Sequence, residues 1–265
     1  MKDNGEKISM LTAYDYSIAK IIDRAGIDVV LVGDSASNVF AGHETTLPIT
    51  LDQMIYHATS VVKATNRALV VVDLPFGSYQ SDSNSALKSA IRIMKESGAH
   101  AVKLEGGERV IPQITAMVNA GIPVMGHIGL TPQSVHQMSG FKVQGKGVSS
   151  AKKLIEDSLK IQEAGAFSLV LEGIPTELAK IITERLEIPT IGIGAGPYCD
   201  GQIQVFHDIL GLDKSFNPKH GKKYTNLQDE ITKAIKSYKK EVTTKKFPTS
   251  KNSTKLNSSV LKSIS

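Results

Sequence analysis

Three acidic residues stand at the ends of three short apolar runs, where their side chains could do chemistry together. Asp34 ends VVLVGD, Asp73 ends LVVVD and Glu105 ends AVKLE. Short runs rich in Val and Leu are typical of buried parallel strands. Asp34 and Asp73 are 39 residues apart, and Asp73 and Glu105 are 32 apart, which is about one strand–helix unit each. The pattern predicts three carboxylates at the same end of neighbouring strands.

Carboxylates that converge repel one another unless a positive charge lies between them. In a parallel barrel the carboxyl ends of the strands meet on one face, and chemistry takes place there. A hard divalent cation with oxygen ligands, Mg²⁺ first, would neutralise such a group. The alternative is that each acid only caps the helix that follows it. Because three acids share one relative position, we expect a metal site with Asp34, Asp73 and Glu105 as ligands.

Other strand ends carry further polar side chains. Lys103 lies two residues before Glu105 and therefore on the same face of its strand. A buried lysine needs an anion, so Lys103 binds either substrate or a neighbouring acid in a structural ion pair. His127 is expected to contact substrate, with a hydrogen-bonded core residue as the alternative. Glu172 follows an apolar run and precedes Gly-Ile-Pro, which suits a general base or acid better than a helix cap.

These groups together suit enolate chemistry on a 2-oxo acid. The keto and carboxylate oxygens of such a substrate can chelate Mg²⁺, and the metal stabilises the negative charge that appears when the neighbouring carbon loses a proton. A lysine beside the metal adds positive charge at the same oxygens. A base takes the proton, and an electrophile delivered nearby completes a carbon–carbon bond.

The elements that must position these residues alternate along most of the chain. Segments of helical periodicity lie between the apolar runs, and four of them end at Gly26, Gly98, Gly121 and Gly165, where a C-cap favours a left-handed residue. Regular alternation of eight units predicts a closed (β/α)₈ TIM barrel. An open doubly wound sheet is the alternative, but TAYDYS rather than GxGxxG follows the first run. The expected strands are residues 8–13, 29–33, 68–74, 101–104, 123–128, 168–171, 189–193 and 203–206, and the expected helices are 16–25, 51–64, 86–97, 151–164 and 177–186.

Composition narrows the class of protein and the place where it works. The chain has 265 residues, 41% of them hydrophobic, with no Trp and a single Cys, Cys199, which excludes an internal disulfide framework and fits a reducing compartment. No run is long enough for a membrane span, and the polar N-terminus lacks the pattern of a signal peptide. We therefore expect a cytoplasmic protein with no membrane partner.

The charge of the chain is concentrated near its C-terminus. Residues 236–265 hold eight Lys and one Glu, a local charge of +7 against +5 for the whole chain, so the first 235 residues carry −2. This segment is also rich in Ser, Thr and Asn, which disfavours a packed core. We expect a single barrel domain over residues 1–240 and a basic, disordered tail over residues 241–265. The chain lacks the interleaved basic and aromatic residues of a nucleic-acid surface.

The motifs around these residues resemble one family in order along the chain. Together they are similar to the 3-methyl-2-oxobutanoate hydroxymethyltransferase family, which forms ketopantoate (2-dehydropantoate) in pantothenate synthesis. The resemblance runs from about Ile8 to Leu212 and consists of TAYDYS, VGDS, GHETTLPIT, DLPFGSYQ, VKLEGGE, GHIGLTPQS, FKVQGKG, EGIP, IPTIGIGAG and DGQIQVFHDILGL.

The resemblance implies a fold, a site and an assembly. The fold would be the barrel of the phosphoenolpyruvate mutase and isocitrate lyase group, and the one-carbon donor would be methylene-tetrahydrofolate. Glu172 matches the proton acceptor of the family, and the assembly would be a homo-decamer. Mg²⁺ would be bound by Asp34, Asp73 and Glu105, and the 2-oxo acid by Asp34, Ser35, Asp73 and Lys103, with His127 nearby.

Two places depart from the family pattern, and two other functions compete. Ala36-Ser37-Asn38 replaces a more apolar turn that contains Gly, and Gln204 and Phe206 stand where Leu and Met are usual. A lyase or mutase of the same barrel group is one competing interpretation, but such enzymes carry a reactive Cys on a middle loop and this chain has none there. A barrel that binds substrate and metal without turnover is the other. The presence of Glu172 together with Lys103 and all three acids argues against it.

Overall fold

Eight parallel strands close into a barrel, as the sequence predicts. The computed structural model describes residues 1–138, 140, 142–216 and 218–264. The last strand pairs with the first, Ile8 opposite Gly201, so the sheet is closed and the open doubly wound alternative is wrong. Each strand ends within two residues of its predicted bounds. The strands are β1 (Ile8–Thr12), β2 (Val29–Val32), β3 (Leu69–Asp73), β4 (Ala101–Lys103), β5 (Val124–Gly129), β6 (Ser168–Glu172), β7 (Thr190–Ile193) and β8 (Gly201–Gln204).

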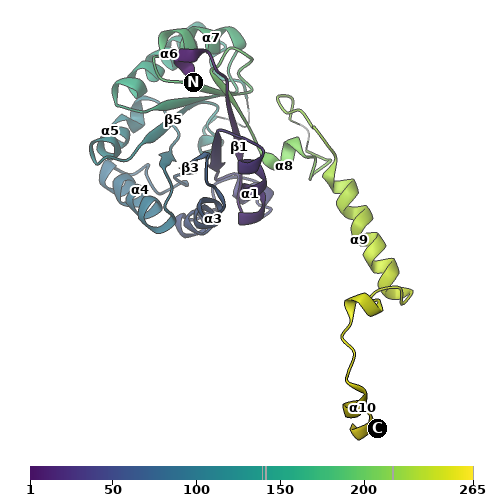
Figure 1. Ribbon diagram of the computed structural model, residues 1–265. Helices are drawn as coiled ribbons and strands as arrows, with labels where there is room; N and C mark the ends of the chain where they lie inside the picture. Colours follow the sequence, from purple (N-terminus) through teal and green to yellow (C-terminus); the bar gives the residue numbers. More distant parts are fainter. Residues whose placement is uncertain (139, 141, 217, 265) are drawn as a thin grey trace. The chain divides into compact units, whose positions relative to one another are not determined.

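Helices surround the strands on the outside of the barrel (Figure 1). The five predicted helices are confirmed to within three residues at each end, and the four glycines predicted to follow helices all have positive φ. The list of expected helices did not include α5, which is short and directly follows a 3₁₀ turn. The helices of this part of the chain are α1 (Tyr16–Arg24), α2 (Ala36–Val39), α3 (Leu51–Ala64), α4 (Ser83–Ser97), α5 (Ile111–Asn119), α6 (Val148–Glu163), α7 (Thr176–Arg185) and α8 (Phe206–Ile209), with 3₁₀ turns η1 (Lys2–Asn4), η2 (Glu108–Val110) and η3 (Pro132–Ser134).

Side-chain caps fix where several of these helices begin. Asp15 accepts a hydrogen bond from the backbone N–H of Ile18 at the start of α1, and Asp82 does the same for Ser85 in α4. Thr50 and Gln53 form a capping box at the start of α3. Because each helix start fixes the loop before it, these caps also hold the loops that leave the carboxyl ends of the strands.

The interior of the barrel is apolar below its carboxyl end. Inward-facing side chains from the strands pack there and are almost completely buried, as close packing of a small barrel requires. This layer supports the polar strand ends above it without adding charge. It consists of Met10, Val29, Leu31, Val71, Ala101, Met125, Val170, Ile191 and Ile203.

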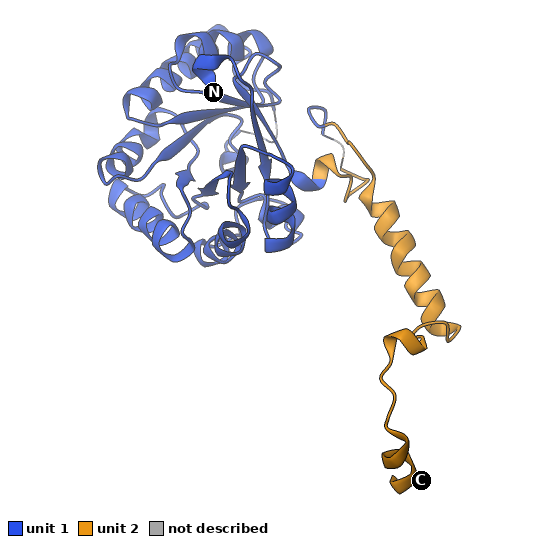
Figure 2. Ribbon diagram, viewed as in Figure 1, with its two compact units in different colours: residues 1–207, 218–221 blue, residues 208–217, 222–265 orange. Residues whose placement is uncertain are grey.

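The chain divides into two compact units (Figure 2). Residues 1–207 and 218–221 form the barrel unit, and residues 208–217 and 222–265 form the second. The second unit contains α9 (Leu227–Thr243), η4 (Ser250–Asn252) and α10 (Ser258–Ile264). The boundary predicted at residue 240 therefore falls inside α9, and disorder of the last residues stays a prediction. Among the described helices, none combines the length and the apolar character that crossing a membrane requires. Phe141 of the FKVQGKG motif lies outside the described residues.

Candidate active site

The three predicted carboxylates converge at the carboxyl end of the barrel. Asp73 is the last residue of β3, while Asp34 and Glu105 each follow a strand by two residues. All three are buried, with 3–5% of their surface exposed. The backbone N–H of Asp34 donates to Asp73 Oδ2 at 3.0 Å, which fixes these two strand ends against each other. The structure therefore brings together the acids that spacing alone predicted to meet.

Lys103 supplies a positive charge among these acids. Its Nζ lies 3.0 Å from Asp73 Oδ1 and 3.2 Å from His127 Nδ1. Burial by itself would lower the pKa of Lys103, but the carboxylates of Asp73, Glu105 and Asp34 raise it well above its usual value. The ammonium group therefore stays charged and is directed at the same place as the carboxylates.

Burial and mutual repulsion change the protonation of two of the acids. Burial, together with the neighbouring Asp73 charge, raises the pKa of Asp34 to about 7. Burial and the Asp34 charge likewise raise the pKa of Glu105 well above its usual value. One ammonium group is thus not enough to neutralise this cluster, which favours the binding of additional positive charge.

His127 lies between the lysine and Glu172. Its Nδ1 faces Lys103 Nζ, and its Nε2 lies 3.2 Å from Glu172 Oε2. Burial and the Lys103 charge lower the pKa of His127, so the ring is neutral near pH 7. With Nδ1 accepting from the ammonium group, the ring proton belongs on Nε2, beside the Glu172 carboxylate. The neutral imidazole therefore lies next to the Glu172 carboxylate without forming an ion pair with it.

Glu172 is the most accessible of the charged residues in this group. It ends β6, and 17% of its side chain is exposed, against 3–6% for His127, Lys103 and Asp73. Gly129 of β5 lies directly against its carbonyl: a Cβ at Gly129 would stand 2.2 Å from Glu172 O, and φ there is +97°. Only glycine permits this approach, so strand β5 lies directly against the backbone of Glu172.

Ser35 is also at the site, held by a residue that the sequence did not single out. The hydroxyl groups of Ser35 and Tyr14 are 2.8 Å apart. Gly33 has to be small here, because a Cβ would stand 2.7 Å from Ser35 Oγ. Ser37, one of the departures from the family pattern, is fully buried and donates from Oγ to Thr45 O at 2.8 Å. The altered turn is therefore accommodated by a hydrogen bond of its own.

Gln133 and Tyr79 are site residues that sequence reasoning missed. Gln133 Nε2 donates to Asp34 Oδ2 at 2.8 Å, and the Gln133 backbone N–H donates to Glu105 Oε2 at 3.0 Å. Tyr79 OH lies 2.7 Å from Gln133 Oε1. Both residues stand in the quoted motifs DLPFGSYQ and GHIGLTPQS, but on loops, where no periodicity shows which way a side chain points.

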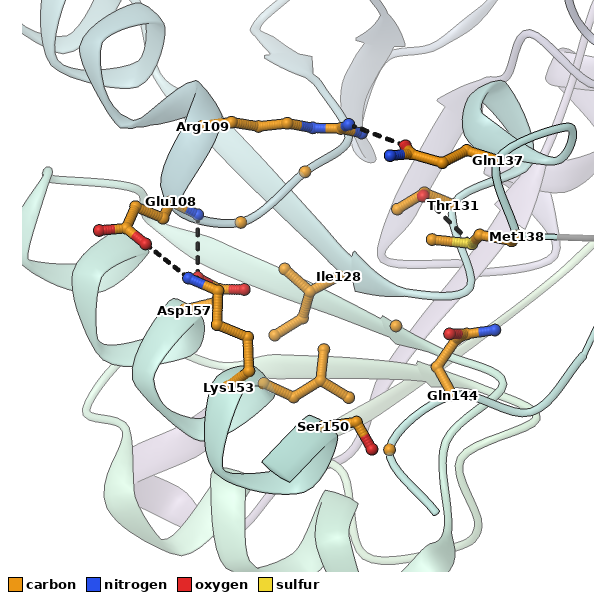
Figure 3. Close-up of a pocket in the computed structure, with 15 residues that line it drawn as sticks. Glu108, Arg109, Ile128, Thr131, Gln137, Met138, Gln144, Ser150, Lys153 and Asp157 are labelled. Carbon is orange, nitrogen blue, oxygen red and sulfur yellow. Dashed lines mark hydrogen bonds and ion pairs between the residues drawn. The ribbon is translucent and has the colours of Figure 1, made fainter. Parts of the chain in front are cut away.

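A cavity of about 470 Å³ is lined by residues of β5, of the segment that follows β4 and of α6 (Figure 3). Its wall includes Gly106, next to Glu105, and Ile128, which faces the opposite side of β5 from His127. Leu154 of α6 adds apolar surface, and Arg109 stands at its edge. Lys153 also lines the cavity, but it is paired there with Glu108 and Asp157. The volume is in the range of small-molecule sites.

The donor set fits a hard cation by its chemistry, although the side chains do not form a closed ligand sphere. Across the described residues, no three His, Cys, Asp or Glu side chains are arranged to hold a metal ion as they stand. The carboxylates of Asp34, Asp73 and Glu105 are nevertheless buried together, and carboxylate oxygen is the ligand that Mg²⁺ prefers. Asp73 Oδ1 also accepts no hydrogen bond of ordinary geometry from any described residue.

Comparison with known proteins decides the family. A sequence model of the family described as ketopantoate hydroxymethyltransferase matches residues 1–250. The chain belongs to the ketopantoate hydroxymethyltransferase family. It is 62% identical to the 3-methyl-2-oxobutanoate hydroxymethyltransferase of Flavobacterium johnsoniae, over 94% of this chain and 91% of the relative. The enzyme of the same name from Cytophaga hutchinsonii is also 62% identical, with the same coverage. Family membership makes the chain a transferase that forms ketopantoate.

Solved structures agree with the predicted barrel fold. The fold is similar to that of 2,3-dimethylmalate lyase, a PEP mutase/isocitrate lyase superfamily member, with a TM-score of 0.57 and 16% identity over 99% of this chain and 90% of the other. At that identity the likeness concerns the fold alone. It therefore confirms the predicted (β/α)₈ barrel.

Proposed function

We propose that the chain transfers a hydroxymethyl group from methylene-tetrahydrofolate to 3-methyl-2-oxobutanoate in a Mg²⁺-dependent reaction, forming ketopantoate for pantothenate synthesis. The observation that carries the proposal is the cluster of Asp34, Asp73, Glu105 and Lys103 at one end of the barrel, buried and short of positive charge. Family membership supports the product. The chemistry of the cluster supports the metal.

The substrate would be held through its two adjacent oxygen-bearing groups. Asp34, Asp73 and Glu105 would hold Mg²⁺, which when bound supplies positive charge for the enolate oxygen of the substrate. Lys103 directs its ammonium group at the same place and stays charged because of the acids around it. Ser35, held by Tyr14, offers a hydroxyl to the substrate carboxylate.

Glu172 would take the proton from the methine carbon of the substrate. Its carboxylate has the greatest exposure of the charged groups in the cluster, so it can reach a substrate that lies over the acids. The neutral His127 ring lies against it, with Nε2 3.2 Å from Glu172 Oε2. The carbon that loses the proton then bonds to the donated methylene carbon, a water molecule supplies the hydroxyl group, and tetrahydrofolate leaves.

The cavity whose wall includes Gly106 supports a second, larger reactant. Apolar side chains such as Ile128 and Leu154 could cover a flat ring, and Arg109 at its edge could attract a carboxylate, while Lys153 is already paired with Glu108 and Asp157. Tetrahydrofolates combine a flat ring with a carboxylate-bearing end. The homo-decamer implied by the resemblance stays a prediction, which mass photometry would check.

Proton exchange at the substrate tests the proposal before any carbon transfer. The methine proton of 3-methyl-2-oxobutanoate is followed by NMR in D₂O with purified protein, with and without Mg²⁺ and tetrahydrofolate. We expect exchange that requires Mg²⁺, followed by ketopantoate formation when methylene-tetrahydrofolate is added. A folded protein that shows no exchange with both Mg²⁺ and tetrahydrofolate present would contradict the enolate mechanism.

A further inference from the structure

Gln133 joins three strand ends of the site from a single loop. It lies in η3, the turn that follows β5, and is buried, with 5% of its surface exposed. Its Nε2 donates to Asp34 Oδ2 at 2.8 Å and to Leu74 O at 2.9 Å, and its backbone N–H donates to Glu105 Oε2 at 3.0 Å. One residue therefore contacts two of the proposed metal ligands and the chain segment that follows the third.

The orientation of the Gln133 amide is fixed from its other side. Tyr79 OH lies 2.7 Å from Gln133 Oε1, and Gln80 Nε2 donates to the same oxygen at 3.0 Å. With an amide and a hydroxyl donating to Oε1, the NH₂ group must face Asp34. Rotating the amide by 180° would place its NH₂ group against the Gln80 donor and its oxygen against the Asp34 carboxylate.

Tyr79 completes the network by also holding Glu105. The backbone N–H of Glu105 donates to Tyr79 OH at 3.1 Å, and Tyr79 itself is almost completely buried. The hydroxyl thus fixes both the amide of Gln133 and the backbone of Glu105. Gln133 thus holds one oxygen of Asp34 and one of Glu105, and neither Gln133 nor Tyr79 contacts the second oxygen of these two carboxylates.

We propose that Gln133 is a positioning residue that orients Asp34 and Glu105 for a divalent cation, with Tyr79 holding the amide in place. Hydrogen bonds from outside the ligand shell commonly orient metal-binding carboxylates, and losing one typically weakens metal binding about 10- to 100-fold. The inference rests on the proposed metal site. It adds that a loop residue, Gln133, which is not itself a ligand, is needed to orient the ligands.

The test replaces Gln133 by a side chain of similar size without hydrogen bonds. In Gln133→Leu, binding of Mn²⁺ to the substrate-free protein, measured by electron paramagnetic resonance, should weaken about 10- to 100-fold. Gln113→Leu is the matched control, because Gln113 is buried to the same degree and contacts Tyr79 only through its backbone oxygen, at 3.3 Å. Its Mn²⁺ affinity should stay within about twofold of the unaltered chain.

Tyr79→Phe provides a second route to the same answer if Gln133→Leu does not fold. Removing the hydroxyl takes away one of the two donors to Gln133 Oε1 and the acceptor of the Glu105 N–H. Mn²⁺ affinity should therefore fall in the same direction, and the effects of the two substitutions should be less than additive. Unchanged Mn²⁺ affinity in a folded Gln133→Leu or Tyr79→Phe protein overturns the positioning role. Absence of Mn²⁺ and Mg²⁺ binding to the unaltered chain instead overturns the proposed metal site, and the inference with it.

Discussion

Carboxylates are buried at both ends of the barrel, but under opposite conditions. At the amino end, the Asp23 side chain accepts hydrogen bonds from three consecutive backbone N–H groups, those of residues 66–68, at 2.9–3.1 Å. Burial alone would raise the pKa of Asp23, but these donors lower it below its usual value. At the carboxyl end, burial and neighbouring charge raise the pKa values of Asp34 and Glu105.

The difference shows that buried acids stabilise the fold at the amino end of the barrel and destabilise it at the carboxyl end. An acid whose charge is satisfied by fixed backbone donors stabilises the folded state. Acids placed together with one lysine destabilise it, and they remain ready for a cation or a substrate. An apolar layer, which includes Leu31, Val71 and Met125, separates the two ends. The arrangement agrees with the general division of such barrels into a catalytic face and a stability face.

The largest expected effect concerns Glu172. Glu172→Gln keeps the shape of the side chain but cannot take a proton, so turnover should fall roughly 10³-fold. Binding of 3-methyl-2-oxobutanoate should change little. Steady-state assays and proton exchange in D₂O measure both. Glu177→Gln, an exposed residue in the first turn of α7, is the matched control. Surviving turnover would show that another group is the base.

A second pair of substitutions compares how the two ends of the barrel affect substrate binding. Asp73→Asn removes a proposed ligand and the partner of Lys103, so Mg²⁺-dependent binding of the 2-oxo acid should weaken on the order of 100-fold or more. Asp28→Asn, at the amino end, removes the charge of a side chain that accepts two hydrogen bonds from Ser9 and should leave binding unchanged. Titration calorimetry compares the two. Equal affinities would exclude Asp73 from the metal site.

A substitution at the amino end should change the stability of the fold instead of substrate binding. Asp23→Asn places an amide N–H against a backbone donor and should lower the free energy of unfolding by about 2 kcal/mol, or the melting temperature by roughly 6 °C. Because the pKa of Asp23 is lowered in the fold, its contribution is present at neutral pH and is lost as pH falls below about 4. The deficit of Asp23→Asn should therefore shrink in acid.

Turnover of folded Asp23→Asn should match that of the unaltered chain. Asp52→Asn serves as the control for stability, because its exposed ion pair with Arg92 contributes little. If Asp23→Asn melts like the control, the three backbone hydrogen bonds do not stabilise the fold as argued.

The smallest expected effect has the opposite sign. Glu105→Gln should stabilise the metal-free protein by about 1 kcal/mol at pH 8, since it removes a charge that the fold disfavours. A raised pKa means that stability falls as pH rises from about 4 through the folded pKa, so the advantage should vanish near pH 4. Denaturant unfolding in EDTA measures it, with Glu163→Gln, an exposed residue of α6, as the control. A destabilised Glu105→Gln protein would contradict the comparison.

The sequence predicts the ends of strands better than the loops between them. Asp34, Asp73, Lys103 and Glu105 could be placed because parallel strands in a closed barrel carry their ends to one face, whatever the loops do. Gln133 could not be placed, because its role depends on a 3₁₀ turn that carries it across three neighbouring strands. Loop direction is set by packing and by hydrogen bonds such as the one from Tyr79, which have no period in the sequence.

Element boundaries were predictable where caps or glycines mark them. The helix ends at Gly98 and Gly165 agree with the structure because a left-handed residue stops a helix. The division at residue 240 was drawn from charge and composition, and these do not prevent a helix such as α9 from running past it. Composition indicates whether a segment can form a packed core. It does not predict where a helix ends, which depends on backbone hydrogen bonds.

The pairing of β8 with β1 also has a consequence for how the chain is made. A closed barrel has no free strand edge, and a free edge is where chains aggregate by pairing with one another. Until residues 201–204 dock, however, β1 and β7 both present open edges. The last strand in the sequence thus closes the barrel. Before it docks, pairing between the open edges of two chains would compete with closure. Refolding yield should therefore depend on protein concentration up to that point.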